Sequence, residues 1–127
     1  MIHFLPVKEA RVMMSKELRD GLDRIYNWQD TTPRTWCILE TWGPRNVIGV
    51  VQFELHGELI HEMGTVVVER WRDSGTAGWL WTCLLENTGA VAVKSTLVSE
   101  GGDRLAESLR RRFPEIDWQL SVKRGDL

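Results

Sequence analysis

The stretch from residue 63 to residue 85 constrains the fold of this chain more than any other part. It begins with MGTVVV (63–68), a run typical of a strand inside a sheet, and ends with WLWTCLL (79–85), an apolar run with helical character. Between them RDSGTA (72–77) forms a turn that contains Gly75. A helix that starts after such a turn presents unpaired N–H groups and its positive dipole end to an anion. We therefore predict a strand–turn–helix unit that holds a phosphate-like group, although the turn matches neither GxxxxGK[ST] nor GxGxxG.

Hydrophobic periodicity and turn residues predict a single domain, residues 1–127, with a mixed α/β sheet in the order β-α-β-β-β-α-β-α-β. Gly21 is expected to weaken or split the first helix. Gly101 and Gly102 predict a break, after which Asp103 caps the last helix. The strands are expected at 2–7, 36–41, 47–55, 59–68, 90–98 and 117–123, and the helices at 8–27, 75–87 and 103–112.

The composition limits the classes of function. With 16 basic and 18 acidic residues the net charge is −2, so a nucleic-acid partner is not expected. Cys37 and Cys83 lie in apolar runs and are predicted to be buried free thiols in a reducing compartment, not a disulfide or nucleophiles. No apolar stretch reaches the length of a membrane span, and the N-terminus lacks a signal-peptide pattern. We therefore expect a cytoplasmic protein without a membrane partner.

The turn and its flanks resemble the cofactor loop of the GNAT superfamily of N-acetyltransferases. In that family the loop reads Arg/Gln-x-x-Gly-x-Gly/Ala and joins the fourth strand to the third helix; Arg72, Gly75 and Ala77 match it. Val67 and Trp71 fit the residues that usually precede the loop, and VIGVVQFEL upstream resembles the family's third strand. The predicted order of elements matches over nearly the whole chain. The resemblance implies a GNAT-like fold, and the small size is typical of a bacterial or bacteriophage protein.

The resemblance implies acetyl-coenzyme A as the co-substrate and no metal. Backbone N–H groups of the loop would hold the pyrophosphate. The edge of the strand before the loop would pair with the pantetheine arm, as an added strand pairs with a sheet edge, in a gap between this strand and the next. The residues expected to bind the cofactor are Val67, Val68, Arg72, Asp73, Ser74, Gly75, Thr76, Ala77 and Gly78.

The resemblance further implies direct transfer of the acetyl group to an amine, carried by a small molecule, a protein or a modified base. A general base helps because the amine must lose a proton to attack. Glu62 lies where some family members place this base, and His61 is the alternative. As strand neighbours they point to opposite faces, so only one faces the cleft, and a bulge would change which one. A metal site here is not expected, because the HExxH pattern fails at Thr65.

Two further expectations concern partners. In GNAT-like proteins the first helix and the following loop wall the acceptor site, so Trp28, Gln29, Asp30 and Arg34 are the expected substrate contacts. A last strand at 117–123 would form a sheet edge, and such an edge can pair with a second chain in a homodimer.

Departures from the family pattern lead to a second hypothesis. Asp73 puts a carboxylate beside the expected pyrophosphate, which is unfavourable unless its side chain turns away to cap the helix. Many members have a tyrosine in the penultimate helix that protonates the leaving thiolate. Here Arg110 lies near that position and the one tyrosine is Tyr26, so Ser99 or a water would have to substitute. The alternative function is a catalytically inactive GNAT-fold interaction protein, such as a small phage modulator of a host protein.

Overall fold

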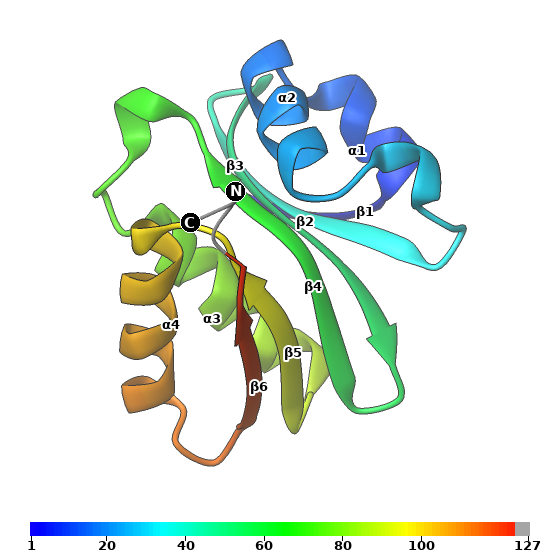
Figure 1. The fold of residues 1–127 in the computed structure, drawn as a ribbon. Coiled ribbons are helices and arrows are strands. Elements are labelled where there is room, and N and C mark those ends of the chain that lie inside the picture. Colours follow the sequence, from blue (N-terminus) through cyan, green and yellow to red (C-terminus); the bar gives the residue numbers. More distant parts are fainter. Residues whose placement is uncertain (124–127) are drawn as a thin grey trace.

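A computed structural model describes residues 1–123 as a six-stranded mixed sheet with helices on both faces (Figure 1). The strands are β1 (Ile2–Pro6), β2 (Thr35–Trp42), β3 (Asn46–His56), β4 (Leu59–Val67), β5 (Ala92–Leu97) and β6 (Asp117–Val122). The helices are α1 (Val7–Met13), α2 (Lys16–Ile25), α3 (Thr76–Thr88) and α4 (Glu100–Arg112), with 3-10 turns η1 (Trp28–Asp30) and η2 (Glu69–Trp71). The sheet order follows the chain; β1 to β4 are antiparallel neighbours, and β5 and β6 continue parallel to β4. The predicted mixed α/β class is confirmed.

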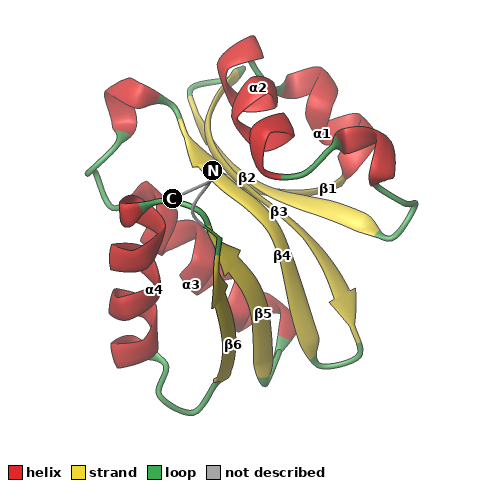
Figure 2. Cartoon of the chain, viewed as in Figure 1, coloured by secondary structure: helices red, strands yellow, loops and turns green. Residues whose placement is uncertain are grey.

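Two apolar layers hold the helices on the sheet. α1 and α2 cover one face, and α3 and α4 cover the other (Figure 2). Strand β3 contributes to both layers, because Val50 faces Leu18 and its neighbours while Val51 faces the layer that contains Leu80. All four side chains are fully buried. Since burying an aliphatic side chain stabilises a fold by about 1.5–3 kcal/mol, these layers fix the centre of the sheet.

The first helical segment differs from its prediction. The sequence predicts one helix over 8–27 that Gly21 weakens or splits; instead α1 ends at Met13 and α2 begins after Ser15, whose Oγ accepts a hydrogen bond from the N–H of Leu18 at 3.4 Å. Gly21 lies inside α2, where a Cβ would come within 2.8 Å of a methyl carbon of Val66 on β4. The prediction of a split at Gly21 is therefore wrong: this glycine permits close packing of helix on sheet, and the serine cap starts the second helix.

The start of α4 also differs from its prediction. The expected break at Gly101 and Gly102 does not occur, and Asp103 is not the cap. Ser99 is the cap: its Oγ accepts a hydrogen bond from the N–H of Gly102 at 3.0 Å, and both glycines lie in the first turn. First-turn N–H groups have no partner inside the helix, so a side-chain cap that satisfies one of them can offset the low helix propensity of glycine.

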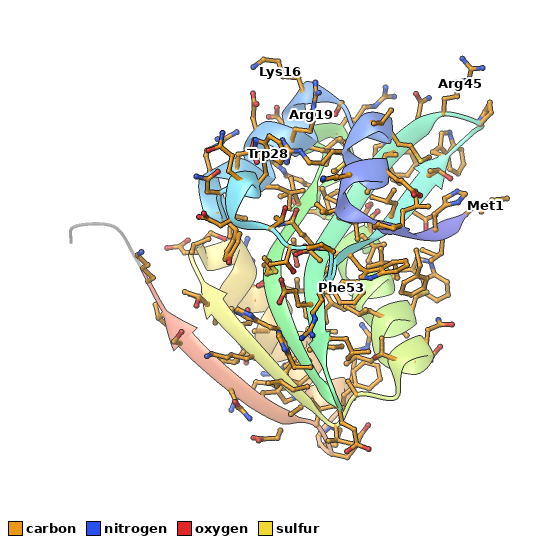
Figure 3. All side chains as sticks on the ribbon, turned by 90° about the vertical axis from the view of Figure 1, so that its right-hand side faces the viewer. Met1, Lys16, Arg19, Trp28, Arg45 and Phe53 are labelled. Atoms are coloured by element: carbon orange, nitrogen blue, oxygen red, sulfur yellow. The ribbon has the colours of Figure 1, made fainter. Side chains whose placement is uncertain are left out.

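The sheet splits between β4 and β5. Pairing between these strands is limited to three positions, Leu59–Ala92, Ile60–Val93 and His61–Lys94. Beyond them β5 stays paired with β6 as far as Leu97 and Val122, while β4 stays paired with β3. The two strands diverge along their length, as Figure 3 shows. The second half of β4 therefore has one unpaired edge.

The expectations about partners have different outcomes. β6 is an edge strand, as predicted, because its one sheet neighbour among residues 1–123 is β5. Its pairing with a second chain stays a prediction. None of the helices in residues 1–123 combines the length and the apolar character that crossing a bilayer requires.

Candidate active site

The split in the sheet opens a cleft of about 670 Å³. The cleft runs through the sheet, from α2 on one face to α3 and α4 on the other, with β4 and β5 as its two sides. Its polar and charged lining residues include Glu17, Arg24, Glu62, Thr65, Arg72 and Ser95. Much of the remaining wall is apolar, which gives the cleft the character of a ligand site with a few placed polar groups.

A hydrogen-bonded network surrounds Glu62 at the point where the strands separate. Its Oε1 accepts a hydrogen bond from Ser95 Oγ on β5 at 2.8 Å, and its Oε2 accepts one from Thr65 Oγ1 at 3.1 Å. The Thr65 hydroxyl in turn accepts a hydrogen bond from Trp81 Nε1 on α3 at 3.1 Å. Three elements thus fix the orientation of one carboxyl group that lines the cleft.

A β-bulge brings Glu62 and Thr65 to the same face. Val51 on β3 pairs with Thr65 on β4, and Phe53 pairs with Glu62. One residue of β3 therefore lies between these pairs where β4 has two, so β4 has one extra residue there. Gly64 lies in this extra stretch with φ +135°, a conformation that a side chain disfavours. Without the bulge, residues three apart in a strand would point to opposite faces.

The two residues predicted as alternative bases differ in place. Glu62 lines the cleft, whereas His61 does not; the His61 ring lies 6.3 Å from the His56 ring and its strand partner is Glu54. The bulge follows Glu62 along the chain and so leaves these two neighbours on opposite faces. Of the two hypotheses, the geometry favours Glu62.

The environment of Glu62 shifts its proton affinity. Burial raises the pKa of its carboxyl above the ordinary glutamate value, against the opposing effect of hydrogen bonds from Ser95, Thr65 and the backbone of Gly64. The residue is nevertheless part-buried and lines the cleft, so a ligand there can reach it. A carboxylate with a raised pKa is a stronger base than an exposed one, which suits proton removal near neutral pH.

The loop between β4 and α3 forms the predicted turn. Gly75 is the N-cap of α3 with φ +86°, and no side chain caps the helix, so its first N–H groups stay available. Asp73 has φ +61° and an exposed side chain that does not cap α3. Ser74 is also exposed, and its Oγ donates a hydrogen bond to the Trp71 carbonyl and contacts Thr76 Oγ1 at 2.7 Å. The strand–turn–helix unit is therefore present and the first N–H groups of α3 have no side-chain cap, while the binding of an anion there stays a prediction.

The predicted cofactor-binding residues divide into two groups. Val67, Arg72 and Ala77 line the cleft, and Arg72 Nε donates a hydrogen bond to the Val67 carbonyl at 3.2 Å. The Val68 N–H pairs with Ile48 on β3, so the polar groups of Val67 point the other way, toward the unpaired edge. The other six predicted residues do not line the cleft. One follows β4 directly and the rest lie in the loop before α3 or in its first turn: Val68, Asp73, Ser74, Gly75, Thr76 and Gly78.

The loop residues predicted to contact substrate lie elsewhere. Trp28, Gln29 and Asp30 belong to η1 and Arg34 follows it; all four are exposed and none lines the cleft. The Trp28 ring packs under the Arg11 guanidinium, 5.1 Å from ring centroid to carbon. Their contact with a substrate stays a prediction.

The wall formed by α4 offers few proton donors. Its cleft-lining residues are Gly101, Gly102, Leu105, Ala106 and Leu109, preceded by Ser99 at the rim. Arg110 is exposed and lines a separate hollow beside Glu107 and Pro114. The Ser99 hydroxyl is thus the polar side-chain group that this segment brings to the cleft.

The cysteines, and the histidine and acidic residues of the described range, do not form a second candidate centre. Burial raises the pKa of Cys37 to about 12 and also raises that of Cys83, so both remain protonated thiols at neutral pH. Within residues 1–123 no group of three or more histidine, cysteine, aspartate or glutamate side chains has the geometry to hold a metal ion.

Sequence reasoning missed three members of the Glu62 network: Thr65, Ser95 and Trp81. Thr65 is a polar residue inside the otherwise apolar run MGTVVV, and that interruption is the signal that was available; Ser95 lies between Lys94 and Thr96, so its segment gives no such signal. Their grouping depends on contacts between residues far apart in the sequence: Thr65 and Trp81 are 16 positions apart, and Glu62 and Ser95 are 33 positions apart. No local pattern reports such a pairing.

Comparisons with known proteins address the fold. No protein-family model and no curated protein sequence matches the chain. Among solved structures, an IAA acetyltransferase from Bacillus cereus is 22% identical with a TM-score of 0.65, covering 86% of this chain and 74% of that one. A ribosomal-protein-alanine N-acetyltransferase from Brucella melitensis is 17% identical with a TM-score of 0.64, covering 86% and 90%. A Bacteroides thetaiotaomicron protein assigned to the GNAT family is 14% identical with a TM-score of 0.59, covering 87% and 70%.

The chain has the GNAT acetyltransferase fold. Another similar structure, YhhK from Escherichia coli, is bound to coenzyme A, with 16% identity and a TM-score of 0.50. The cleft extends from the split between β4 and β5 to Ala77 in the first turn of α3.

Proposed function

We propose that this chain is an N-acetyltransferase that moves the acetyl group of acetyl-coenzyme A to an amine, with Glu62 as the general base. The observation that carries the proposal is the position of the Glu62 carboxyl at the split between β4 and β5, in the cleft that also reaches Ala77 at the start of α3. The GNAT fold and the coenzyme A bound to the similar YhhK support it.

Three features of the cleft fit coenzyme A. The uncapped N–H groups of α3 suit a pyrophosphate. The unpaired edge of β4 can offer the backbone groups of Val67 to the amides of the pantetheine arm, in the manner of an added strand. A Cβ built on Gly75 has no atom within 4 Å, so the approach to the helix start is open. The Arg72 side chain donates a hydrogen bond to the Val67 carbonyl. While Arg72 stays in this position, the Val67 N–H is the group that can pair with the pantetheine arm.

The residues around Glu62 would prepare it for proton removal. Bound acetyl-coenzyme A supplies the acetyl group as an activated thioester. As the new C–N bond forms, Glu62 accepts the proton that the amine loses. Ser95 and Thr65 hold one carboxylate oxygen each, so the direction of the free lone pairs is fixed before the amine arrives. The sulfur that leaves takes a proton from Ser99 at the rim or from solvent.

Calorimetric titration with acetyl-coenzyme A and with free coenzyme A tests the cofactor site. We expect micromolar binding that Gly75→Glu abolishes, because a carboxylate would then stand at the helix start. Gly75→Asn is the matched control, since asparagine tolerates positive φ and adds no charge. Circular dichroism checks that both variants are folded. Failure of the wild-type protein to bind at millimolar ligand contradicts the proposal.

One observation favours a second function, an inactive GNAT-fold interaction protein. The exposed Asp73 carboxylate stands in the loop before α3 without capping that helix, so its charge opposes an anion there. This function predicts that Gly75→Glu leaves the biological effect of the protein intact. The enzyme predicts that the same variant loses the effect together with coenzyme A binding, and the two outcomes separate the hypotheses.

A further inference from the structure

Another hollow lies beside the cleft, where α1 meets α2 at one end of the sheet. Its volume is about 460 Å³, and it is lined by the α1–α2 connection, the β2–β3 turn and η2. We call it the end groove and define it by Met13, Trp42, Arg45, Val47, Arg70 and Trp71. Its floor is aliphatic, because Val47 and the neighbouring Met14 and Ile48 are 5–6% exposed.

Two tryptophans form the wall of the end groove. The centroids of Trp42 and Trp71 are 5.2 Å apart and their planes make an angle of 47°. Trp42 is 63% exposed and Met13 is 37% exposed, so large apolar side chains meet solvent at one place. The two rings pack against each other and leave no slot between them for a planar base. This wall suits an aliphatic side chain of a ligand.

The rim of the end groove is cationic. Arg45 and Arg70 are exposed, and neither forms an ion pair with any residue in the described range 1–123. Arg45 projects outward from the β2–β3 turn, as Figure 3 shows. The carboxylate that lines the groove is that of Glu17, whose Oε2 accepts a hydrogen bond from the Glu69 N–H at 2.7 Å. The rim thus carries positive charge although the net charge of the chain is −2.

The end groove continues into the cleft at Glu17. This residue, in the first turn of α2, lines both hollows. An acceptor whose amine lies at Glu62 can therefore extend past Glu17 into the groove. A small amine is too short to occupy both places, whereas an extended polypeptide advances about 3.3 Å with each residue.

We propose that the end groove binds the polypeptide chain of the acceptor and selects an acidic, apolar segment. An aliphatic side chain packs against Trp42, Trp71 and the aliphatic floor, and carboxylates pair with Arg45 and Arg70. Arginine suits this task because its planar fork matches a carboxylate. This inference rests on the proposed function, because it names the acceptor of that same site.

Acetylation of designed peptides tests this substrate class. Three lysine-free peptides with a free α-amine share the same leucines and differ in having glutamate, glutamine or arginine at the other positions. The rate of thiol release, with mass spectrometry of the product, gives kcat/KM for each. We expect the acidic peptide to exceed the basic one by roughly tenfold, since exposed ion pairs are individually weak.

Charge reversal makes the test specific. The double variant Arg45→Glu, Arg70→Glu should reverse the preference, so that the basic peptide becomes the better acceptor. If the two substitutions only damaged the groove, kcat/KM would fall by the same factor for all three peptides. Lys8→Glu is the control, because this exposed cation on α1 does not line the groove. Trp42→Ala should lower kcat/KM for all three peptides by roughly the same factor.

Several outcomes would overturn the inference. They are equal rates for the three peptides, a preference that charge reversal leaves unchanged, or a wild-type dimer that charge reversal dissociates, which would assign the groove to a second copy. Titration with acetyl-coenzyme A keeps the proposed function separate. If the protein binds none and acetylates nothing, direct peptide titration still tests the groove, and failure to bind the acidic peptide contradicts it.

Discussion

The two halves of β4 have opposite environments. Leu59, Ile60 and His61 pair on both edges, with β3 and with β5, and Ile60 is fully buried. The residues from Glu62 onward pair with β3 alone and turn their other edge to the cleft. One strand thus supplies the sheet centre with its first half and a candidate site with its second. The candidate site therefore lies at the point where the pairing of β4 with β5 ends, while the pairing of β4 with β3 continues.

The sequence of β4 changes where the pairing ends. The first half is Leu-Ile-His, and the second half begins with Glu62 and contains Gly64 and Thr65. Glu62 supplies the carboxyl group, Gly64 adopts the positive φ of the bulge, and the Thr65 hydroxyl donates a hydrogen bond to Glu62. A continued run of β-branched apolar residues would lack these polar groups and the glycine.

The first prediction removes the base from the open half. Glu62→Gln keeps the shape and loses the proton acceptor, so we expect kcat to fall by about 10²–10⁴ while affinity for acetyl-coenzyme A is retained. Steady-state kinetics with an accepted amine and calorimetry measure the two quantities. Glu54→Gln, on β3 opposite His61, is the control and should change kcat less than about twofold. An equal loss in both variants would remove Glu62 from its proposed role.

The second prediction attacks the bulge itself. Gly64 has φ +135°, and a Cβ there would lie 2.9 Å from a methyl carbon of Leu22, so Gly64→Ala should reduce the free energy of unfolding by about 1–3 kcal/mol. Urea denaturation measures the change. Gly57→Asn is the matched control in the β3–β4 turn, where φ is +63°, no atom lies within 4 Å of a Cβ, and asparagine tolerates the conformation. A Gly64 variant as stable as this control would show that the bulge accepts a side chain.

The two halves of β4 also differ in how far the sequence predicts them. The order of strands and the glycine turn before α3 follow from periodicity and local turn chemistry, which are properties of neighbouring residues. The bulge had a signal in Gly64, because a glycine inside a strand marks such irregularities, but its position relative to Glu62 depended on the register with β3. The bonds from Ser95 and Trp81 depend on tertiary packing, so the sequence predicted the carboxyl and not its partners.

The third prediction compares two carboxyl groups on opposite faces of the sheet, Glu62 on β4 and Glu54 on β3. Burial raises the pKa of Glu62, so its contribution to stability is complete below the ordinary glutamate pKa and is lost as pH rises through the raised value. For Glu54, burial alone would raise the pKa, but hydrogen bonds from Thr35, Thr32 and His56 outweigh it and lower that pKa. Its contribution is present above the ordinary pKa and is lost as pH falls through the lowered value.

Unfolding measurements across pH separate the two carboxyl groups. Relative to wild type, Glu62→Gln should gain stability as pH rises from about 4 to 8, because it removes a carboxylate that is costly to ionise. Glu54→Gln should lose stability over the same change, because it removes a carboxylate that the fold stabilises. If the free energy of unfolding changed with pH in the same way in both variants, the opposite pKa shifts of Glu62 and Glu54 would be contradicted.

The smallest expected effect concerns the loop that the open half of β4 leads into. Asp73 is exposed, and its charge lies near the uncapped start of α3, so Asp73→Asn should raise the affinity for acetyl-coenzyme A by roughly two- to fivefold. Asparagine keeps the positive φ of +61°, so the loop geometry is preserved. The gain should shrink in high salt, since the interaction is between exposed charges. Glu115→Gln, an exposed carboxylate between α4 and β6, should change nothing, and equal affinities for wild type and Asp73→Asn would mean that the Asp73 charge does not act on the bound anion.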